Sequence, residues 1–286
     1  MCMAKTLKKR IGITGANGNL GKNIIKRYNS KYKFLKFSGN VVNKKEIFNW
    51  VKNNNFEFII HLAAKVPIEL VEKKYINSLK VNYEGTRNLV DAINFYNKKN
   101  INWFFFASTA QVYNYSSIKI REKSNYGNIS KYGYSKIKAE KYIIKHLRKN
   151  VRLCIGRIFS FTSIQQDSSF FIPSIFNKIK NSKTSFFYYE RLDQRRDFIH
   201  IHDLSRAIIF LMNKRYNNII NIGSGKKIKL DFIIKYFTNK FKKKIVYKKK
   251  TGNRTKNDLC PNIEKLKKLG FKSKFNINHI LKDFIN

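Results

Sequence analysis

A glycine-rich turn near the start of the chain constrains the fold more than any other feature. The apolar segment 11–14 is short enough for a buried strand, and Gly15, Gly18 and Gly21 follow it. Apolar residues at helical spacing in 20–28 predict that the last glycine enters a helix. Such a helix start presents backbone amides and a positive dipole end to a phosphate, and side chains at the glycine positions would block its approach. The turn therefore predicts a pyrophosphate cradle, the alternative being an ordinary glycine turn that caps a helix.

Strands and helices alternate along the first half of the chain. Short apolar strands are predicted at 34–37, 58–62, 103–106 and 151–158, with helices between them at 44–53, 79–96 and 132–147. This alternation predicts an α/β fold, a doubly wound parallel Rossmann sheet covered by helices on both faces. In such sheets ligands bind beyond the carboxyl ends of the strands. Those ends carry Gly15, Ala63-Ala64, Ser108-Thr109 and Phe159-Ser160.

After residue 158 the pattern changes to a helix at 170–179, an extended segment at 184–189 and a helix that ends near Met212. We see no repeats and no clear linker, so the second lobe is expected to be assembled from separated segments. The predicted domains are a dinucleotide-binding Rossmann domain at 8–158, completed by about 195–225, and a smaller α+β substrate lobe. The substrate lobe is expected to comprise residues 159–194 and 226–286.

The chain carries an extreme positive charge. Its 286 residues include 60 Lys and Arg against 17 Asp and Glu, a formal net charge of +43. Such a charge is typical of nucleic-acid binding, but lysine dominates over arginine and is spread over most of the sequence. Base recognition usually depends on arginine. The composition therefore favours drift toward amino acids of A/T-rich codons, and nucleic acid is not expected as a partner.

Location and metal content are constrained by what the sequence lacks. It has no apolar run long enough to span a membrane and no export signal. Its three cysteines, Cys2, Cys154 and Cys260, are far apart and form neither a metal-binding spacing nor a disulfide framework. We therefore expect a cytoplasmic protein without a membrane partner and without a metal.

Tyr132 and Lys136 are the strongest candidates for catalysis. On a helix they share a face, and an ammonium beside a phenol favours the phenolate, so that Tyr132 can exchange a proton with a substrate oxygen. Thr109, at the end of the strand before this helix, could hydrogen-bond the same oxygen. A chain with 16 tyrosines produces the Tyr-x-x-x-Lys spacing by accident, but only Tyr132 opens a helix after a strand that ends in Ser-Thr.

Together, these pieces resemble the extended short-chain dehydrogenase/reductase family, which comprises NAD(P)-dependent nucleotide-sugar epimerases, dehydratases and reductases. Further stretches that look like signatures of this family are His61–Ala64, Val81–Leu89, Ser108–Tyr113, Arg196–His200 and Asn221–Gly225. The resemblance implies a nucleotide-sugar substrate, a part in polysaccharide biosynthesis, and a homodimer formed through helices 79–96 and 132–147.

The resemblance also implies which residues bind ligands. The implied cofactor contacts are Gly15, Asn17, Gly18, Asn19, Leu20, Gly21, Ser38, Asn40, Val41, Leu62, Ala63, Ala64, Lys65, Asn82, Tyr132, Lys136 and Phe159. The implied substrate contacts are Ser108, Thr109, Ser160 and Arg196, the last gripping the diphosphate of the sugar nucleotide. His200 and His202 are interpreted as packing or capping residues.

The choice of dinucleotide is expected to depend on the segment after the second strand. A carboxylate there normally binds the ribose hydroxyls of NAD, whereas residues 35–42 contain no acid. Lys36 and Ser38 could accept a 2′-phosphate, so the segment favours NADP over NAD. Asn40 stands where the family usually has the aspartate of its adenine contact.

The reaction is narrowed by the two residues after Thr109. The family's 4,6-dehydratases carry Asp-Glu there, and this chain has Ala110-Gln111, which argues against dehydration. A reductase acting on the 4-keto group of an NDP-4-keto-6-deoxyhexose and a 4-epimerase with tightly bound NAD both remain, the reductase being favoured. A non-catalytic relative that binds RNA is the third reading. Residues 189–194 and Ser160 depart from the family pattern, so the base and the sugar stay open.

Overall fold

The computed structural model describes residues 8–66, 68–96, 100–127, 130–190, 193–247 and 258–285. Within these residues the chain forms two compact units. The first comprises the chain up to Ser108, with Ser130–Gly156 and Ser205–Ile219, and the second comprises Thr109–Ile129, Arg157–Leu204 and the chain from Ile220. The functional division into a dinucleotide domain and a substrate lobe at the boundaries given above stays a prediction.

The described chain contains a six-stranded sheet in the order β10-β5-β4-β3-β1-β2. Its strands are β1 (Arg10–Thr14), β2 (Lys33–Lys36), β3 (Phe58–His61), β4 (Trp103–Thr109), β5 (Arg152–Ile158) and β10 (Asn218–Ile222). The pairs β1–β2, β1–β3 and β3–β4 are parallel, and Gly12 lies in register with Leu35 on one side and Ile59 on the other. The strand order reverses beside β1, which is where a doubly wound sheet binds its ligand. The predicted doubly wound parallel sheet is confirmed.

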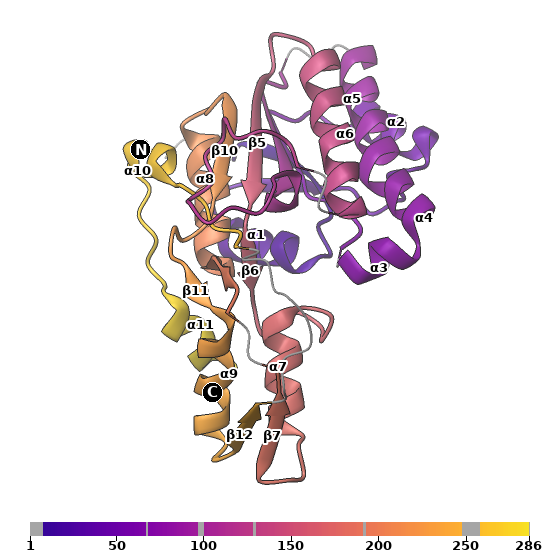
Figure 1. Cartoon of the computed structure of the whole chain (residues 1–286). Helices are drawn as coiled ribbons and strands as arrows, with labels where there is room; N and C mark the ends of the chain where they lie inside the picture. The colour runs from indigo at the N-terminus through magenta and orange to yellow at the C-terminus, as the bar shows by residue number, and fades with distance from the viewer. Residues whose placement is uncertain are drawn as a thin grey trace, which may run out of the picture. The chain divides into compact units, whose positions relative to one another are not determined.

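Helices pack against this sheet, as Figure 1 shows for α2 (Lys44–Asn53), α5 (Gly85–Tyr96) and α6 (Lys131–His146), which lie side by side. Leu89, Ile93 and Ile143 of these helices are fully buried in one core cluster with Ile59 and Phe104 of the strands. Apolar side chains at helical spacing on these helices thus pack against strands that are apolar throughout. Two further helices are α1 (Asn19–Tyr28) and α8 (Ile201–Asn213), joined by the bond from Ser205 Oγ to Asn23 Oδ1, 2.8 Å long.

The single helix predicted at 79–96 is wrong in one respect, because a π-helical turn interrupts it. The structure has α4 (Tyr75–Leu79), the π turn η1 (Lys80–Glu84) and then α5. The Gly85 amide donates to Lys80 O, five residues back, so one extra residue enters the turn. A Cβ at Gly85 would lie 2.5 Å from Val41 Cγ2, so the helix approaches that loop only because residue 85 is glycine. The helix α3 (Ile68–Lys73) was not predicted.

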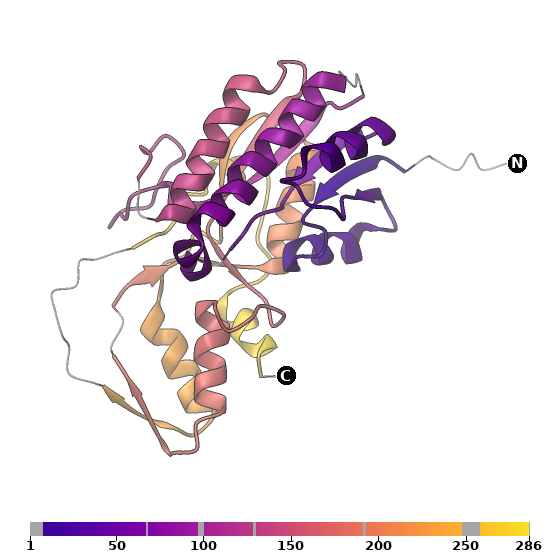
Figure 2. The same ribbon diagram turned by 90° about the vertical axis from the view of Figure 1, so that its right-hand side faces the viewer.

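Among its described residues, the second unit contains three small sheets with helices, an α+β arrangement. β6 (Ser160–Thr162) pairs with β9 (Phe198–His200), β7 (Phe186–Tyr189) with β12 (Lys244–Tyr247), and β8 (Arg195–Arg196) with β11 (Ile228–Lys229). Its helices are η2 (Ala110–Val112), α7 (Phe171–Lys180), α9 (Leu230–Lys240), α10 (Glu264–Lys268) and α11 (Ile277–Asp283). Figures 1 and 2 show α7 and α9 side by side. They bury Ile175, Ile179, Ile233 and Phe237 together.

None of the helices in the described ranges combines the length and apolar character that a membrane crossing would require. Cys154 and Cys260 are both buried and free, and burial raises the pKa of the Cys260 thiol to about 12. Both thiols are therefore held in the inert protonated form. Cys2 lies outside the described residues.

Candidate active site

The three glycines of the turn after β1 have different structural tasks. Gly15 adopts φ +68°, and a Cβ there would lie 2.7 Å from Ala63 N at the tip of β3. A Cβ at Gly21 would collide with Gly15 O and lie 2.8 Å from Ala16 Cα, so this glycine lets α1 pack on the turn. A Cβ at Gly18 would meet only Gly15 O, at 3.4 Å. The protein itself does not require glycine at position 18, whereas a phosphate lying against the turn would.

The start of α1 suits an anion. Gly18 stands at its N-cap without a side-chain hydrogen bond to the helix, and the first turn contains no acidic residue. By contrast, Asn43 caps α2 and Ser130 caps α6 with their side-chain oxygens. An uncapped helix start provides backbone amides and a positive dipole end for a pyrophosphate. The residues of this turn therefore fit the dinucleotide that the sequence predicts, with Asn17, Asn19 and Leu20 flanking the glycines.

The loop after β2, expected to face the adenosine part of the cofactor, is held by its own hydrogen bonds. Asn40 Oδ1 accepts from Val42 N at 3.0 Å, and Asn40 N donates to Glu46 Oε2 at 2.8 Å. The other oxygen of Glu46 accepts from Asn43 Nδ2 at 2.6 Å. Sequence reasoning missed Glu46 because it lies beyond the loop, in the first turn of α2. Ser38 is exposed and Val41 is buried in this loop.

The segment after β3 is fixed by two other elements. Leu62 N donates to Thr14 O at 3.2 Å and Ala63 N donates to Thr14 Oγ1 at 3.3 Å, both at the end of β1. Lys65 N donates to Asn82 Oδ1 at 2.7 Å, which ties the segment to η1. Leu62, Ala63, Ala64, Lys65 and Asn82, all predicted cofactor contacts, thus form one connected structure beside the glycine turn.

The helix α6 carries the predicted catalytic pair. Ser130 Oγ accepts from Gly133 N at 2.9 Å and caps the helix, so the half-buried Tyr132 stands in the first turn. Lys136 lies one turn later and is 1% exposed, with its Nζ 4.5 Å from the centre of the Phe106 ring. Burial lowers the pKa of Lys136 to about 7, and the negative charge of Glu140 opposes this. The sequence correctly predicted the shared helix, and the depth of Lys136 is a finding of the structure.

Glu140 is a buried carboxylate on the same face of α6 that sequence reasoning missed. It is fully buried, and it accepts a hydrogen bond from the Ser108 hydroxyl. A signal was present, because Lys136 and Glu140 are separated by one helical turn, a spacing that pairs opposite charges. Ser108 is itself 4% exposed, and its hydroxyl proton is used in the bond to Glu140. Its role as a substrate contact stays a prediction.

Thr109 belongs to the second unit and is the last residue of β4. Its side chain is largely buried, and its Oγ1 accepts from Gln111 N at 3.2 Å. Within the described residues this hydroxyl accepts a bond and donates to no protein atom, so its proton can serve a ligand oxygen. That Thr109 and Tyr132 meet at one substrate oxygen stays a prediction.

The remaining predicted contacts also lie in the second unit. Phe159 is buried and its ring stacks on Tyr113 with 6.2 Å between ring centres. Ser160 opens β6 in register with Phe198 of β9. The Arg196 guanidinium lies 5.4 Å from the centre of the Tyr115 ring and donates through Nη1 to Arg195 O at 3.0 Å. Burial lowers the pKa of Arg196, while its neighbours favour the charged form.

Asp197 and His200, which follow Arg196, both form hydrogen bonds within the second unit. Asp197 is fully buried and accepts from Ser224 N at 2.8 Å, Ser224 Oγ at 2.7 Å and Lys226 N at 3.0 Å. His200 Nε2 bonds Asp283 Oδ2 at 2.8 Å, and His200 Nδ1 accepts from His202 N at 3.0 Å. These contacts agree with the interpretation of His200 as a packing and capping residue. Burial raises the pKa of Asp197 to about 6.

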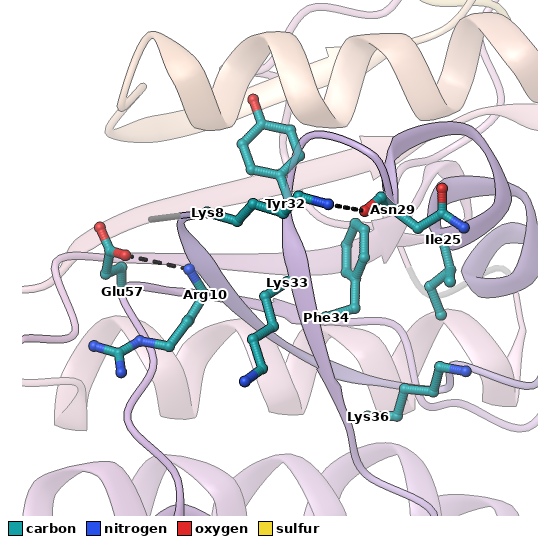
Figure 3. Close-up of a pocket in the computed structure, with 9 residues that line it drawn as sticks. All are labelled: Lys8, Arg10, Ile25, Asn29, Tyr32, Lys33, Phe34, Lys36 and Glu57. Carbon is teal, nitrogen blue, oxygen red and sulfur yellow. Dashed lines mark hydrogen bonds between the residues drawn. The ribbon is translucent and has the colours of Figure 1, made fainter. Parts of the chain in front are cut away.

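A concavity of about 730 Å³ in the first unit is lined by residues of β1, α1 and β2 and by Glu57 (Figure 3). Arg10, Lys33 and Glu57 in its wall stand at the amino ends of β1, β2 and β3, the opposite end of the sheet from the glycine turn. Lys36, which the sequence offered to a 2′-phosphate, also lines it. The Lys8 ammonium is held by Asn29 O at 3.2 Å, and Glu57 Oε1 accepts from Arg10 N at 3.2 Å. None of the three glycines of the turn lines this basic hollow.

Comparison with known proteins decides the family. The family described as "NAD dependent epimerase/dehydratase family" matches residues 11–223. The chain belongs to this family. It is thus an NAD(P)-dependent enzyme by descent, and the match includes the glycine turn, α6 and the segment around Arg196.

Two relatives agree with this assignment. The chain is 28% identical to "GDP-6-deoxy-D-talose 4-dehydrogenase" of Aggregatibacter actinomycetemcomitans, over 76% of this chain and 74% of the relative. It is 24% identical to "Putative UDP-glucose 4-epimerase" of Methanocaldococcus jannaschii, over 86% of this chain and 81% of the relative. The family member is thus similar both to a dehydrogenase and to an epimerase.

Solved structures share the fold across nearly the whole chain. The RMD protein of Pseudomonas aeruginosa complexed with NADPH has a TM-score of 0.84 and 19% identity, covering 97% of this chain and 98% of that one. The protein MoeE5 in complex with UDP-glucose and NAD has a TM-score of 0.83 and 18% identity, covering 96% of this chain and 97% of that one. At these identities the likeness shows the fold alone.

Proposed function

We propose that this family member is a nucleotide-sugar oxidoreductase that reduces the 4-keto group of an NDP-4-keto-6-deoxyhexose. The observation that carries the proposal is the pair on α6, in which a half-buried Tyr132 stands one turn before a Lys136 ammonium that is almost fully buried. A positive charge in a poorly solvated site acts strongly on a neighbouring phenol. Tyr132 is therefore suited to hold and transfer a proton at a substrate oxygen.

The proposed mechanism assigns one task to each residue. The bound dinucleotide would supply or accept hydride. Tyr132 donates its phenolic proton to the substrate oxygen as the carbonyl carbon is reduced, and Lys136 stabilises the resulting phenolate. Thr109, whose hydroxyl proton is not used within the described protein, donates a second hydrogen bond to that oxygen and orients the carbonyl. Arg196 is assigned to the diphosphate and Ser160 to the sugar.

A reductase is favoured over a dehydratase and over an epimerase for two reasons. Thr109 is followed by Ala110 and Gln111, which provide no carboxyl group for the acid–base chemistry of water loss. One relative is a 4-dehydrogenase of a GDP-6-deoxyhexose, which acts at the carbon that we propose. The second candidate is a 4-epimerase with tightly bound NAD, which the other relative supports.

We propose NADP rather than NAD as the cofactor. Residues 35–42 contain no carboxylate for the ribose hydroxyls, and both oxygens of the nearby Glu46 already accept hydrogen bonds. Melting temperatures with each dinucleotide would test this choice, because a ligand that binds only the folded state stabilises it. We expect a larger upward shift with NADPH than with NADH. An NAD that copurifies and does not dissociate would favour the epimerase.

The substitution Tyr132→Phe tests the function. We expect turnover of dTDP- or GDP-4-keto-6-deoxyhexose with NADPH to fall by about 10²- to 10⁴-fold, the usual contribution of a general acid. The shift in melting temperature caused by NADPH should persist, because the phenolic oxygen is removed without a change in the fold. Tyr134→Phe is the matched control, since Tyr134 is 38% exposed on the same helix and should leave turnover unchanged.

Two outcomes would contradict the proposal. If turnover survives the substitution Tyr132→Phe, Tyr132 is not the proton donor. A wild-type protein that turns over no nucleotide sugar but shifts labelled RNA at physiological salt would support the non-catalytic reading, in which the charge of +43 serves RNA. We also propose a cytoplasmic homodimer with a part in polysaccharide biosynthesis.

A further inference from the structure

A chain of buried hydrogen bonds runs through the first unit from the end of β1 toward α6. Thr14 Oγ1 lies 2.6 Å from His61 Nδ1, and His61 Nε2 lies 2.9 Å from Thr86 Oγ1. Thr86 Oγ1 donates in turn to Asn82 O at 2.8 Å. Thr14, His61, Thr86 and Asn82 are each at most 1% exposed, so these bonds form away from water.

The partners fix the direction of every bond in this part of the chain. The single hydroxyl proton of Thr86 goes to Asn82 O, so Thr86 Oγ1 accepts from His61 and the proton of His61 lies on Nε2. His61 Nδ1 is then an acceptor and takes the proton of Thr14 Oγ1, which itself accepts from Ala63 N at 3.3 Å. Burial and the nearby Lys136 lower the pKa of His61 to about 3, which keeps the ring neutral.

The side chain of Asn82 continues the chain to the catalytic helix. Its Oδ1 accepts from Lys65 N at 2.7 Å, and its Nδ2 donates to Lys65 O at 3.3 Å and to Ser135 Oγ at 3.0 Å. Ser135 Oγ donates to Tyr132 O at 2.7 Å. Ser135 is fully buried, and the last acceptor is the main chain of the proposed proton donor itself. Asn82 lies in the π turn η1, whose main chain and side chain thus both join the network.

We infer that Thr14, His61, Thr86, Asn82 and Ser135 form a positioning device that fixes the main chain of Tyr132 relative to the glycine turn. This inference rests on the proposed function, since it assumes that Tyr132 acts on a substrate held over a dinucleotide. None of the five side chains needs to touch the reacting atoms. His61 and Ser135 are positioning residues, and their effect is on orientation, to which proton and hydride transfer are sensitive.

The substitution Thr86→Val tests the middle of the chain. Valine keeps the shape of threonine but removes the acceptor of His61 and the donor to Asn82 O. We expect kcat to fall by about 10- to 100-fold, because displacements of about 1 Å have effects of this size. KM and the shift in melting temperature caused by NADPH should stay within about 3-fold and a few degrees of wild type. Thr86→Ser retains the hydroxyl and should restore most of kcat.

Thr238→Val is the matched control for a purely structural effect. Thr238 is fully buried in α9 of the second unit, and its Oγ1 donates to Ile234 O at 3.0 Å, as Thr86 does to the carbonyl four residues before it. A similar loss of thermal stability with unchanged kcat is expected there. If Thr86→Val and Thr238→Val lower kcat equally, or if neither does, the positioning role is overturned.

Ser135→Ala tests the last link in the same way. It removes the donor to Tyr132 O, and we expect kcat to fall by about 10-fold with Ser135→Thr recovering part of it. Ser78→Ala is the control, because Ser78 is 3% exposed on α4 and donates to Lys74 O at 2.9 Å without joining the chain. Equal kcat values for Ser135→Ala and Ser78→Ala would contradict the inference.

The tautomer of His61 gives a readout that does not depend on activity. Imidazole ¹⁵N resonances of the whole protein, with His61 assigned through His61→Gln, should show a neutral ring protonated at Nε2 between pH 8 and pH 5. A ring protonated at Nδ1, or one that becomes charged near pH 6, would contradict the proposed series of hydrogen bonds. If wild type binds NADPH but turns over no nucleotide sugar, the proposed function fails, and the tautomer then decides the hydrogen-bond chain by itself.

Discussion

Lys136 is a cation that the fold removes almost completely from water. Burial disfavours its charged form and lowers its pKa to about 7, so near neutral pH both forms are populated. The charged form of Lys136 is stabilised by Glu140, which lies one helical turn further on and is fully buried. Glu140 in turn accepts a hydrogen bond from Ser108 at the end of β4. The charge of Lys136, and with it the support that we propose for a Tyr132 phenolate, thus depends on a carboxylate that is fully buried.

The substitution Glu140→Gln should therefore change the pH dependence of the reaction. The negative charge of Glu140 raises the pKa of Lys136, so its removal lowers that pKa further and Lys136 loses its proton at a lower pH. We expect the alkaline limb of kcat/KM to move to lower pH by about one unit, with the largest loss of activity above pH 7. Initial rates between pH 5.5 and 9 measure this. Glu264→Gln, which removes an exposed carboxylate near Lys267, should leave the profile unchanged.

A profile of Glu140→Gln that superimposes on wild type would show that this carboxylate does not control Lys136. A loss of activity that is equal at every pH would point instead to a displaced β4, because the Ser108 bond would also be weakened. The two results are distinguishable by shape alone. The stability of the variant, followed by thermal unfolding, separates both from a general failure to fold.

At the scale of elements, the start of α6 decides where Tyr132 stands. Ser130 has an extended backbone, and its side chain accepts from Gly133 N, which closes the first turn around Tyr132. The helix pattern at 132–147 was read from the sequence, and the observed helix begins at Lys131. The cap is thus the local signal that ends the preceding loop and begins the helix.

We expect Ser130→Ala to cost about 1 kcal/mol of stability, the usual effect of losing an N-cap, and also to lower kcat by several-fold. We expect the lower kcat because Tyr132 lies in the first turn of α6, which loses its cap. Asn276→Ala is the matched control, since Asn276 caps α11 in the second unit by accepting from Asn278 N and His279 N. Thermal unfolding and initial rates measured on both variants test this. Asn276→Ala should lose similar stability and keep its kcat, and equal kcat losses would contradict the argument.

Other elements show what local patterns can and cannot predict. The helix at 44–53 was predicted with the bounds that the structure has, because Asn43 caps it and its apolar positions are regular. The helix at 79–96 was predicted as continuous, and the structure inserts η1. The cause of the π turn is tertiary, since Gly85 approaches Val41 and Asn82 is drawn to Lys65 and Ser135. The partners in these contacts lie outside residues 79–96, so the periodicity of that segment cannot predict the π turn.

At the scale of the whole molecule, two properties stand out: the positive charge and the apolar side chains that α5 and α6 leave uncovered. A net charge of +43 opposes association of two copies by repulsion and makes any dimer sensitive to salt. On the other hand, Phe95 of α5 is 72% exposed and Ile144 of α6 is 53% exposed. These two helices lie side by side (Figure 1) and are the ones that the family resemblance assigns to a dimer.

We expect the double substitution Phe95→Lys, Ile144→Lys to halve the mass measured by light scattering at 0.15 M salt. The substitutions remove the apolar side chains that the proposed contact would bury, and they add two positive charges to each subunit, which repel those of the other subunit. Phe232→Lys, at an exposed apolar position of α9, is the control and should leave the mass unchanged. A wild-type protein that is monomeric at every salt concentration would contradict the homodimer.

The sequence by itself determined the parallel sheet, the glycine turn that enters α1, and the placement of Tyr132 and Lys136 on one helix face. Each of these follows from local rules: apolar runs form strands, a Cβ is excluded where the chain bends sharply, and residues four apart share a helix face. Glycine at 15 and 21 is required by the fold, which is why this signal could be read without a structure.

Only the tertiary structure decided how the site is supported. The burial of Lys136, its dependence on Glu140, and the chain from Thr14 through His61 to Ser135 join residues up to 53 positions apart. A hydrogen bond between distant residues has no period and no spacing in sequence, because its geometry is set by how elements pack. The tautomer of His61 is the clearest case, since it is fixed by Thr14, Thr86 and a carbonyl that three different elements bring together.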